Sequence, residues 1–391
     1  MPFTTLLQPK IQHFIRESSG RPVAQLALQK NPFPEVEWIN IVNQIAARDK
    51  AKGKLPTWYA AENIIYPSKL SVEQTSSEIA AKYKSALVSG KNLIDLTGGF
   101  GIDDFYFSKQ VEKVTHCELN LELSAIAKHN FTILGANNIE CLPGDSLELL
   151  KLLDRQWDWI YVDPSRRSDA KGKVFMLRDC LPNVPGLLDT YFEYSPNILL
   201  KTAPLLDIKA GLGELHSVKA IHIVAINNEV KELLWLLEEG YAGKPQIYAI
   251  CITKEGTETF MTALDDEDSA HYSEPQQYLY EPNSAIMKSG AFNTVAHHYN
   301  VAKLHKHTQL YTSDELIEFP GRRFTVENVL PYQKAGIKQI EGRKMNITVR
   351  NFPIQAEEIR KKLKIKDGGD TYAFFTTNLH NEKIIILCSK A

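Results

Sequence analysis

The spacing of apolar residues changes along this chain of 391 residues, and the change predicts where its elements lie. From Met1 to about Ser89, apolar side chains recur mostly at three- and four-residue steps, which is the spacing of one face of a helix. The clearest example consists of Trp38, Ile41, Val42, Ile45 and Ala46. Residues 1–89 are therefore expected to form a helical N-terminal region.

From about residue 90, short apolar runs alternate with amphipathic stretches. The expected strands are residues 92–96, 113–117, 139–142, 157–162, 197–201, 220–226 and 246–253. Expected helices between them include Leu121–Leu134 and Glu229–Glu239. Strands that alternate with helices predict crossover units on a parallel sheet. The expected fold class is α/β, with a doubly wound, seven-stranded, Rossmann-like domain over residues 90–264.

The last part of the chain begins after the acidic segment Asp265–Ser269, whose composition is typical of a linker. Two small α+β modules are expected, at residues 275–320 and 321–391, with a break near Gly321. In the second module, strands are expected at 344–349 and 383–388, on either side of a basic helix at 356–364.

Composition and charge narrow the possible partners. A hydrophobic fraction of 43% with 24% charged residues is typical of a globular protein and excludes a disordered or collagen-like chain. The net charge of −2 argues at first against a nucleic-acid partner. However, residues 300–391 hold 16 Lys and Arg against 10 Asp and Glu, whereas the rest holds 29 against 37. The near-neutral total averages an acidic body with a basic C-terminal part, so it does not exclude RNA.

Other features predict a reduced, cytoplasmic protein without a membrane segment or a metal. The start resembles no secretory signal, and no run approaches the roughly 18 apolar residues of a membrane helix. The five cysteines are scattered and never spaced as CxxC. The pairs His297-His298 and His305/His307 have no cysteine or carboxylate at metal-ligand spacing, so no metal is expected.

The residues with the clearest chemistry follow the first expected strand. Leu93 to Asp103 reads LIDLTGGFGID, a strand that leads into a glycine-rich turn and a helix start. Glycines let a backbone approach a ligand closely, although such a turn can also be merely structural. The next strand ends in Glu118, about 20 residues on, where a ribose-binding acid lies in such folds. The third strand leads to Asp145 and Ser146, so three strand ends are expected to converge on one crevice.

An NAD-binding turn would read GxGxxG, whereas Gly98-Gly99-Phe100-Gly101 follows an acid, Asp95. This arrangement resembles the class I S-adenosylmethionine-dependent methyltransferases, over roughly residues 71–253. The resemblance implies that the loop holds the methionine part of the cofactor, Glu118 the ribose hydroxyls and Asp145 the adenine. The implied cofactor-binding residues are Asp95, Thr97, Gly98, Gly99, Phe100, Gly101, Glu118, Asp145 and Ser146. Upstream, Ser71, Gln74 and Thr75 lie in a segment that resembles the one closing over the cofactor in nucleic-acid methyltransferases.

The fourth expected strand ends in Asp163-Pro164-Ser165-Arg166-Arg167. In methyltransferases of exocyclic base amines, the matching motif is D/N-P-P followed by an aromatic residue that stacks on the extruded base. The resemblance implies that Asp163, Pro164 and Ser165 are the catalytic residues. However, Ser165 and Arg166 depart from the motif, so the identity of the methylated atom stays open. Arg166 and Arg167 can clamp phosphate or stack on a base; the alternative is a solvated basic turn.

Further basic residues are candidates for substrate binding. Lys201 ends the fifth strand, at the same sheet edge as Asp163. Arg360, Lys361 and Lys362 lie on the basic helix, which can follow a phosphate backbone or form a solvated lysine face. Both C-terminal modules resemble the ferredoxin-like and THUMP-like domains that end a family of bacterial methyltransferases. THUMP domains bind RNA, so the resemblance implies an RNA substrate, transfer or ribosomal.

The expected function is that of a methyltransferase using S-adenosylmethionine to modify a base in RNA. Two alternatives stay open: a methyltransferase of a small molecule or protein, and a non-catalytic RNA-binding protein with a vestigial cofactor pocket. An NAD-dependent oxidoreductase would also use Glu118 for ribose, but it would not explain Asp145 or the Asp163-Pro164 turn.

Overall fold

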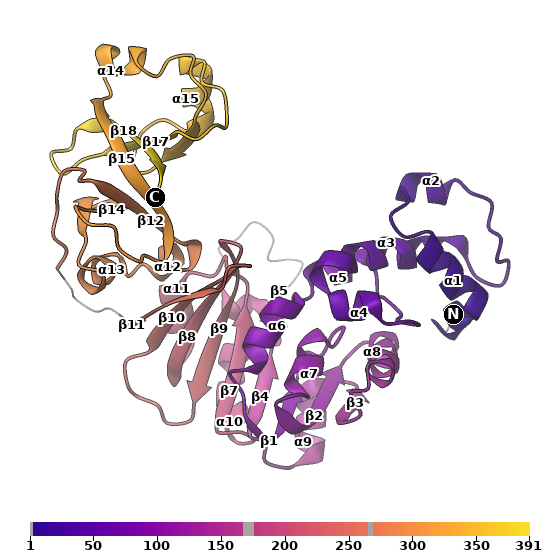
Figure 1. Cartoon of the computed structure of the whole chain (residues 1–391). Coiled ribbons are helices and arrows are strands. Elements are labelled where there is room, and N and C mark those ends of the chain that lie inside the picture. Colours follow the sequence, from indigo (N-terminus) through magenta and orange to yellow (C-terminus); the bar gives the residue numbers. More distant parts are fainter. Residues whose placement is uncertain (1–2, 167–175, 265–268) are drawn as a thin grey trace. The chain divides into compact units, whose positions relative to one another are not determined.

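The computed structural model describes residues 3–166, 176–264 and 269–391 (Figure 1). The chain forms two compact units, residues 1–219 with 232–243 and residues 220–231 with 244–391. Within the described ranges, no helix has the length and apolar character needed to cross a membrane.

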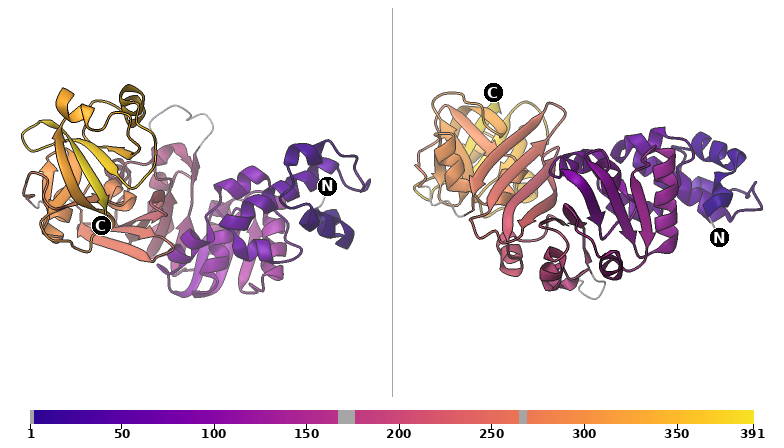
Figure 2. Two further views of the ribbon diagram at one scale, coloured as in Figure 1. Left: turned by 45° about the horizontal axis from the view of Figure 1, so that its top comes forward. Right: turned by 90° about the horizontal axis from the view of Figure 1, so that it is seen from below.

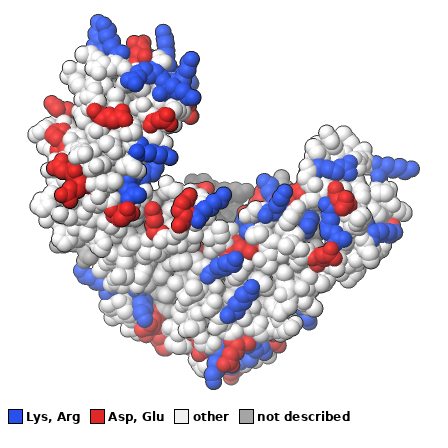
Figure 3. All heavy atoms as spheres, in the orientation of Figure 1, with Lys and Arg blue, Asp and Glu red and all other residues white. Residues whose placement is uncertain are grey.

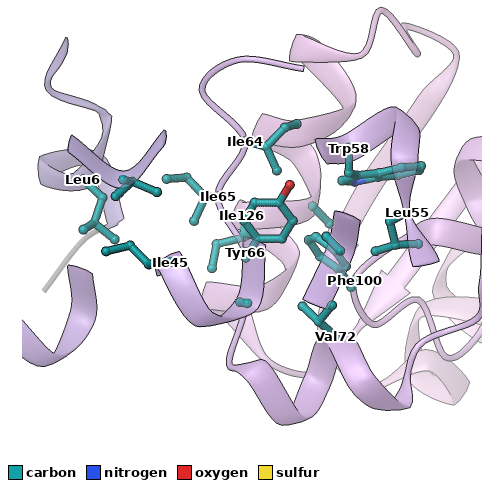
Figure 4. Close-up of a cluster of buried hydrophobic side chains, with 14 of the residues drawn as sticks. Leu6, Ile45, Leu55, Trp58, Ile64, Ile65, Tyr66, Val72, Phe100 and Ile126 are labelled. Carbon is teal, nitrogen blue, oxygen red and sulfur yellow. The ribbon is translucent and has the colours of Figure 1, made fainter. Parts of the chain in front are cut away.

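The helical character of residues 1–89 is confirmed. The helices are η1 (Phe3–Leu7), α1 (Pro9–Glu17), α2 (Val23–Ala27), α3 (Trp38–Lys54), α4 (Pro56–Ala60), α5 (Lys69–Gln74) and α6 (Glu78–Ser85). Their buried side chains, among them Ile45, Trp58 and Tyr66, pack in one cluster with Phe100 and Ile126 (Figure 4). Because Phe100 follows the first strand and Ile126 lies on a helix of the α/β part, the N-terminal helices share a core with that part.

The first unit contains a mainly parallel sheet with the order β9-β7-β4-β1-β2-β3. Its strands are β1 (Gly90–Asp95), β2 (Val111–Glu118), β3 (Ile139–Pro143), β4 (Trp159–Val162), β7 (Asn197–Thr202) and β9 (Glu229–Glu238), of which β9 runs antiparallel to β7. The connecting helices are α7 (Ile102–Phe107), α8 (Leu121–Ile133), α9 (Ser146–Leu153), α10 (Leu188–Phe192) and α11 (Ile208–Glu214). In Figure 2 the strands lie side by side, with helices against them. The strand order reverses between β1 and β4, the switch point at which such sheets bind ligands.

The helix expected at Glu229–Glu239 is wrong, because this segment forms strand β9. Leu233, Leu234, Trp235 and Leu237 are all buried. A strand buried on both faces shows no polar alternation, so its apolar pattern does not separate it from a buried helix. Asn227 and Asn228 have positive φ and form the tight turn between β8 (Val218–Ile226) and β9.

A short hairpin after β4 was not expected from the sequence. Strand β5 (Ser165–Arg166) pairs antiparallel with β6 (Cys180–Leu181), and Ser165 lies opposite Leu181. The one-turn helices η3 (Leu177–Asp179) and η4 (Val184–Gly186) lie on either side of β6. Strand β5 begins two residues after Asp163, and residues 167–175 between β5 and β6 lie outside the described residues.

The second unit begins with strands in the order β8-β10-β11. Strand β10 (Gln246–Ile252) is parallel to β8 and antiparallel to β11 (Thr257–Ala263). All seven strands expected from the apolar runs are therefore present. Residues 265–268 of the predicted linker, Asp265–Ser269, lie outside the described residues.

The C-terminal part forms a second sheet, with the order β13-β14-β12-β15-β18-β17-β16. Its strands are β12 (Tyr278–Pro282), β13 (Ala302–His305), β14 (Thr308–Ser313), β15 (Gly321–Pro331), β16 (Asn346–Val349), β17 (Tyr372–Thr377) and β18 (Lys383–Lys390). Its helices are α12 (Ser284–Ser289), α13 (Phe292–His298), α14 (Lys334–Lys338) and α15 (Ala356–Leu363). Strands β16 and β18 and helix α15 confirm the elements expected in this region.

The expected break near Gly321 coincides with the start of β15, which pairs with β12. Leu279 and Leu310, which precede Gly321, share a buried cluster with Phe324 and Phe374, which follow it. The two C-terminal modules therefore share one sheet and part of one core.

Candidate active site at the carboxyl ends of the parallel strands

The first unit has a cavity of about 640 Å³ at the carboxyl ends of β1, β2, β3 and β4. Eleven residues expected to bind the cofactor line it: Gln74, Thr75, Asp95, Thr97, Gly98, Gly99, Phe100, Gly101, Glu118, Asp145 and Ser146. Two residues expected in the catalytic place, Asp163 and Ser165, line it as well. Pro164 lies between them in the chain. Ser71 belongs to helix α5, but its side chain lies outside the description.

The glycine-rich turn is held by the acid that ends β1. The buried Oδ1 of Asp95 accepts hydrogen bonds from the backbone N–H of Thr97 at 2.7 Å and from its hydroxyl at 3.0 Å. A Cβ atom on Gly98 would lie 2.2 Å from the ring of His116, so this position has no space for a side chain. Gly101 has φ +80° and is the N-cap of helix α7, in a left-handed conformation that favours glycine.

A buried cluster of titratable groups lies beneath this turn. The Nδ1 atom of His116 lies 2.6 Å from Oδ2 of Asp104, and both residues are fully buried. Burial, together with the charge of a neighbouring carboxylate, raises the pKa values of Asp95 and Asp104 well above their usual range. Burial lowers the pKa of His116, so its ring is neutral at neutral pH. Sequence reasoning did not find Asp104 or His116, because only the fold brings them under the turn.

The acids after β2 and β3 are fixed by backbone hydrogen bonds. Glu118 accepts from the N–H of Gly99 at 2.9 Å with one carboxylate oxygen and from Asn120 at 2.7 Å with the other. Each carboxylate oxygen has a second lone pair, so Glu118 can still accept from a ligand hydroxyl. Asp145 caps helix α9 by accepting from the N–H groups of Leu147 and Glu148 at 3.0 and 3.1 Å.

Asp163 is held at the cavity by two contacts. Its backbone N–H donates to the hydroxyl of Thr97 at 2.7 Å, which ties the loop after β4 to the turn after β1. Its Oδ2 accepts from the ammonium group of Lys201, on β7, at 2.5 Å. Lys201 was expected to contact substrate; among the described residues, it is the ionic partner of Asp163 and lies outside the cavity lining.

Behind this pair, charged groups continue into the core of the first unit. The buried Lys84 lies 2.9 Å from Asp103 and 3.3 Å from Glu232, and the hydroxyl of Tyr161 donates to Asp103 at 2.8 Å. Burial opposes the charge of Lys201, yet the nearby carboxylates, chiefly Asp163 and Glu232, raise its pKa above the usual value. No spacing in the sequence indicated Lys84 or Glu232, because Glu232 lies on the strand that was expected to be a helix.

The remaining predicted substrate residues lie elsewhere or outside the description. Arg166 belongs to β5, and neither its side chain nor Arg167 is described. Arg360, Lys361 and Lys362 lie on α15 in the second unit, where Arg360 pairs with Asp367 at 2.7 Å. Lysines and arginines gather around α14 and α15 (Figure 3). The exposed basic residues of this region, called the basic face below, are Lys334, Lys338, Arg343, Lys344, Lys361, Lys362, Lys364 and Lys366. Four exposed acids, Glu341, Glu357, Glu358 and Asp367, belong to the same segment.

The doubly wound sheet is the fold expected of a class I methyltransferase domain, and four acids lie at its strand ends. The chain is 31% identical to a "putative methyltransferase" from Porphyromonas gingivalis W83, whose crystal structure it matches with a TM-score of 0.89 over 100% of this chain and 99% of that one. Residues 278–320 match a ferredoxin-like domain and residues 321–390 a THUMP-like domain. The chain therefore belongs to the bacterial methyltransferase family that carries ferredoxin-like and THUMP-like domains at its C-terminus.

Other solved structures match only part of the chain. An rRNA methylase from Streptococcus thermophilus has 13% identity and a TM-score of 0.30, over 41% of this chain and 93% of that one. The TrmK protein of M. capricolum, in complex with S-adenosyl-homocysteine, has 13% identity and a TM-score of 0.32, over 41% and 68%. A search of curated proteins gave no match.

Proposed function

We propose that the protein transfers a methyl group from S-adenosylmethionine to a base in RNA, either transfer or ribosomal RNA. The observation that carries this proposal is the convergence of Asp95, Glu118, Asp145 and Asp163 on one cavity. The first three acids occupy the places at which class I methyltransferases hold their cofactor. The fourth occupies the place at which base-amine methyltransferases hold the atom to be methylated.

The cavity suits a cofactor of this size and polarity. Its volume of about 640 Å³ falls within the range of about 300–1,000 Å³ of small-molecule sites. In the glycine-rich turn, a Cβ on Gly99 would have only the carbonyl oxygen of Thr97 within 4 Å, at 3.7 Å, so a ligand can approach the backbone closely there. Glu118 would accept hydrogen bonds from the ribose hydroxyls, and Asp145 and Ser146 would meet the adenine.

S-adenosylmethionine supplies an electrophilic methyl group, and the electron pair of the broken C–S bond stays on sulfur. The protein mainly contributes orientation to such an in-line displacement. Asp163 would accept a hydrogen bond from the acceptor N–H, which aligns the nitrogen lone pair with the methyl carbon. The nitrogen loses its proton as or after the N–C bond forms, and Asp163 lies where it can receive that proton. Lys201 holds the carboxylate in place by a charge-assisted hydrogen bond.

The second unit supports RNA as the methyl acceptor. The basic face around α14 and α15 contains eight lysines and arginines, including the exposed Lys361, Lys362, Lys364 and Lys366. Neutralising phosphates with such side chains releases counterions and provides sequence-independent affinity for nucleic acids. The THUMP-like match over residues 321–390 covers the same segment.

The proposal is tested by supplying tritium-labelled S-adenosylmethionine to the full chain with three fractions from a strain lacking its gene: RNA, protein and small molecules. Label is expected in RNA, and nuclease digestion should release it as a methylated nucleoside. Label in the protein or small-molecule fraction alone would assign the chain to another class of methyltransferase. Cofactor binding without transfer to any fraction would favour a vestigial pocket.

A further inference from the structure

We infer that Leu181 and Pro182 form the apolar side of a slot that holds the planar ring of the methyl acceptor beside Asp163. This inference rests on the proposed function and deepens it. It assigns to the β5–β6 hairpin the role that an aromatic residue of the D/N-P-P motif plays in other amine methyltransferases. Here Ser165 and Arg166 occupy the motif positions after Pro164, so the motif itself offers no aromatic ring.

The hairpin brings Leu181 to the catalytic edge of the sheet. Ser165, which is two residues after Asp163 in the chain, lies opposite Leu181 in the β5–β6 pair. Asp163, Ser165, Leu181 and Pro182 all line the same cavity as the cofactor-binding turn. A ring placed against Leu181 and Pro182 would therefore have its polar edge within reach of Asp163.

Leu181 leaves an exposed apolar surface on the wall of the cavity. Its side chain is 55% exposed, whereas the preceding Cys180 is fully buried and anchors the strand. The approach to β6 is also fixed, because the N–H of Leu177 donates to Glu214 at 2.7 Å. A large apolar side chain held on an anchored strand at a cavity wall is a ready contact for an apolar ring face.

The chemistry of this wall selects a flat heterocycle that carries an N–H group. Enzymes that act on a base hold it between aromatic or apolar side chains and recognise its polar edge by hydrogen bonds. Leu181 and Pro182 provide the apolar contact to a ring face, and Asp163 provides the acceptor for an N–H. A flexible aliphatic amine would gain little from the apolar wall.

The test is saturation-transfer NMR on the full chain saturated with S-adenosylhomocysteine, which fills the adenine site, with AMP, GMP, CMP and UMP as probes. At least one nucleotide should receive saturation at its ring protons. Leu181→Ser should weaken that binding by roughly tenfold, as expected for the loss of a buried leucine contact. Leu181→Phe should retain it, because an aromatic ring restores the apolar face. Leu152→Ser, at a leucine 80% exposed on α9, is the matched control.

The outcomes distinguish failure of the proposed ring-binding slot from failure of the proposed methyl transfer. Unchanged ring saturation in Leu181→Ser, or no ring saturation in the wild type, would overturn the slot even if RNA is methylated. Ring binding that depends on Leu181, without any methyl transfer to RNA, would support the slot and contradict the proposed function. Equal affinity of all variants for S-adenosylhomocysteine shows that the cofactor site remains folded.

Discussion

Asp163 is the residue whose surroundings distinguish this site most clearly. Its side chain is 34% exposed, whereas the side chain of its partner Lys201 is only 15% exposed. A charge-assisted hydrogen bond of 2.5 Å at the edge of the core fixes the carboxylate more firmly than a bond in open solvent would. We infer that Lys201 positions Asp163, which in turn contacts the methyl acceptor.

Replacing Asp163 with alanine should separate binding from chemistry. We expect Asp163→Ala to bind S-adenosylhomocysteine normally, because Glu118 and Asp145 remain, and to lose about 100-fold or more in methyl-transfer rate. Calorimetry and tritium transfer to RNA measure the two effects. Asp189→Ala, at a side chain 95% exposed, is the control. Full turnover by Asp163→Ala would show that the acid has another role.

A substitution at Gly98 tests the shape of the glycine-rich turn. A Cβ atom there would lie 2.2 Å from the ring of His116, which is packed in the core. Gly98→Ala should therefore destabilise the protein by about 1–3 kcal/mol, the usual cost of overpacking. We also expect weaker binding of S-adenosylhomocysteine, as measured by calorimetry. Gly213→Ala is the control, because nothing lies within 4 Å of that position in helix α11. Equal melting temperatures for the two variants would contradict this description of the turn.

At the scale of elements, the strands of the parallel sheet could be predicted because buried runs were bounded by turns and separated by helices. The acids at strand ends could be predicted for the same reason, since parallel strands bring their carboxyl ends to one edge. Strand β9 could not be predicted, because Leu233 and Leu234, which lie on opposite faces of the strand, are both buried. Its sequence therefore shows no alternation of apolar and polar residues. The contact between Lys84 and Glu232 depends on that strand, so it was missed too.

A buried histidine on strand β8 makes the stability of the second unit sensitive to acid. His222 on β8 is stacked on Tyr248 on β10, with ring centroids 4.4 Å apart, and burial lowers the pKa of His222 to about 4. The unfolded chain takes up this proton near pH 6.5, so stability is lost as pH falls from there toward 4.

For this residue, we expect a loss of about 2 kcal/mol between pH 7 and pH 5. Urea unfolding of the wild type and of His222→Gln at both pH values measures it, because the difference between the two proteins isolates this histidine. A wild type and a variant with the same pH dependence would show that His222 does not carry the effect.

At the scale of the whole molecule, charge is divided unequally along the sequence. After residue 299 the chain has 16 Lys and Arg and 10 Asp and Glu; up to that residue it has 29 Lys and Arg and 37 Asp and Glu. Together these give the net charge of −2. The acidic share includes Asp95, Glu118, Asp145 and Asp163, which line the cavity. The basic share includes the face around α14 and α15, so the total charge is a poor guide to the partner.

If that face follows a phosphate backbone, the affinity for RNA should fall linearly with salt on a log–log plot. Replacing both Lys361 and Lys362 with alanine should then lower the steepness of this plot by about 2. Lys30→Ala with Lys52→Ala, both at exposed positions of the N-terminal region, is the control. Filter binding of total RNA from about 50 to 200 mM salt measures the slope. A slope unchanged by the α15 substitutions would place the RNA contacts elsewhere.

The proposed methyl transfer requires that the cavity at the strand ends holds S-adenosylmethionine. Calorimetric titration of the cofactor into the full chain tests it most directly, with NAD⁺ titrated in parallel and with Glu118→Ala as the site variant. We expect one site per chain for S-adenosylmethionine, no binding of NAD⁺, and an affinity about tenfold weaker or more in Glu118→Ala, equivalent to about 1.4 kcal/mol. Binding of NAD⁺ in place of S-adenosylmethionine, or cofactor binding unaffected by the loss of Glu118, would contradict it.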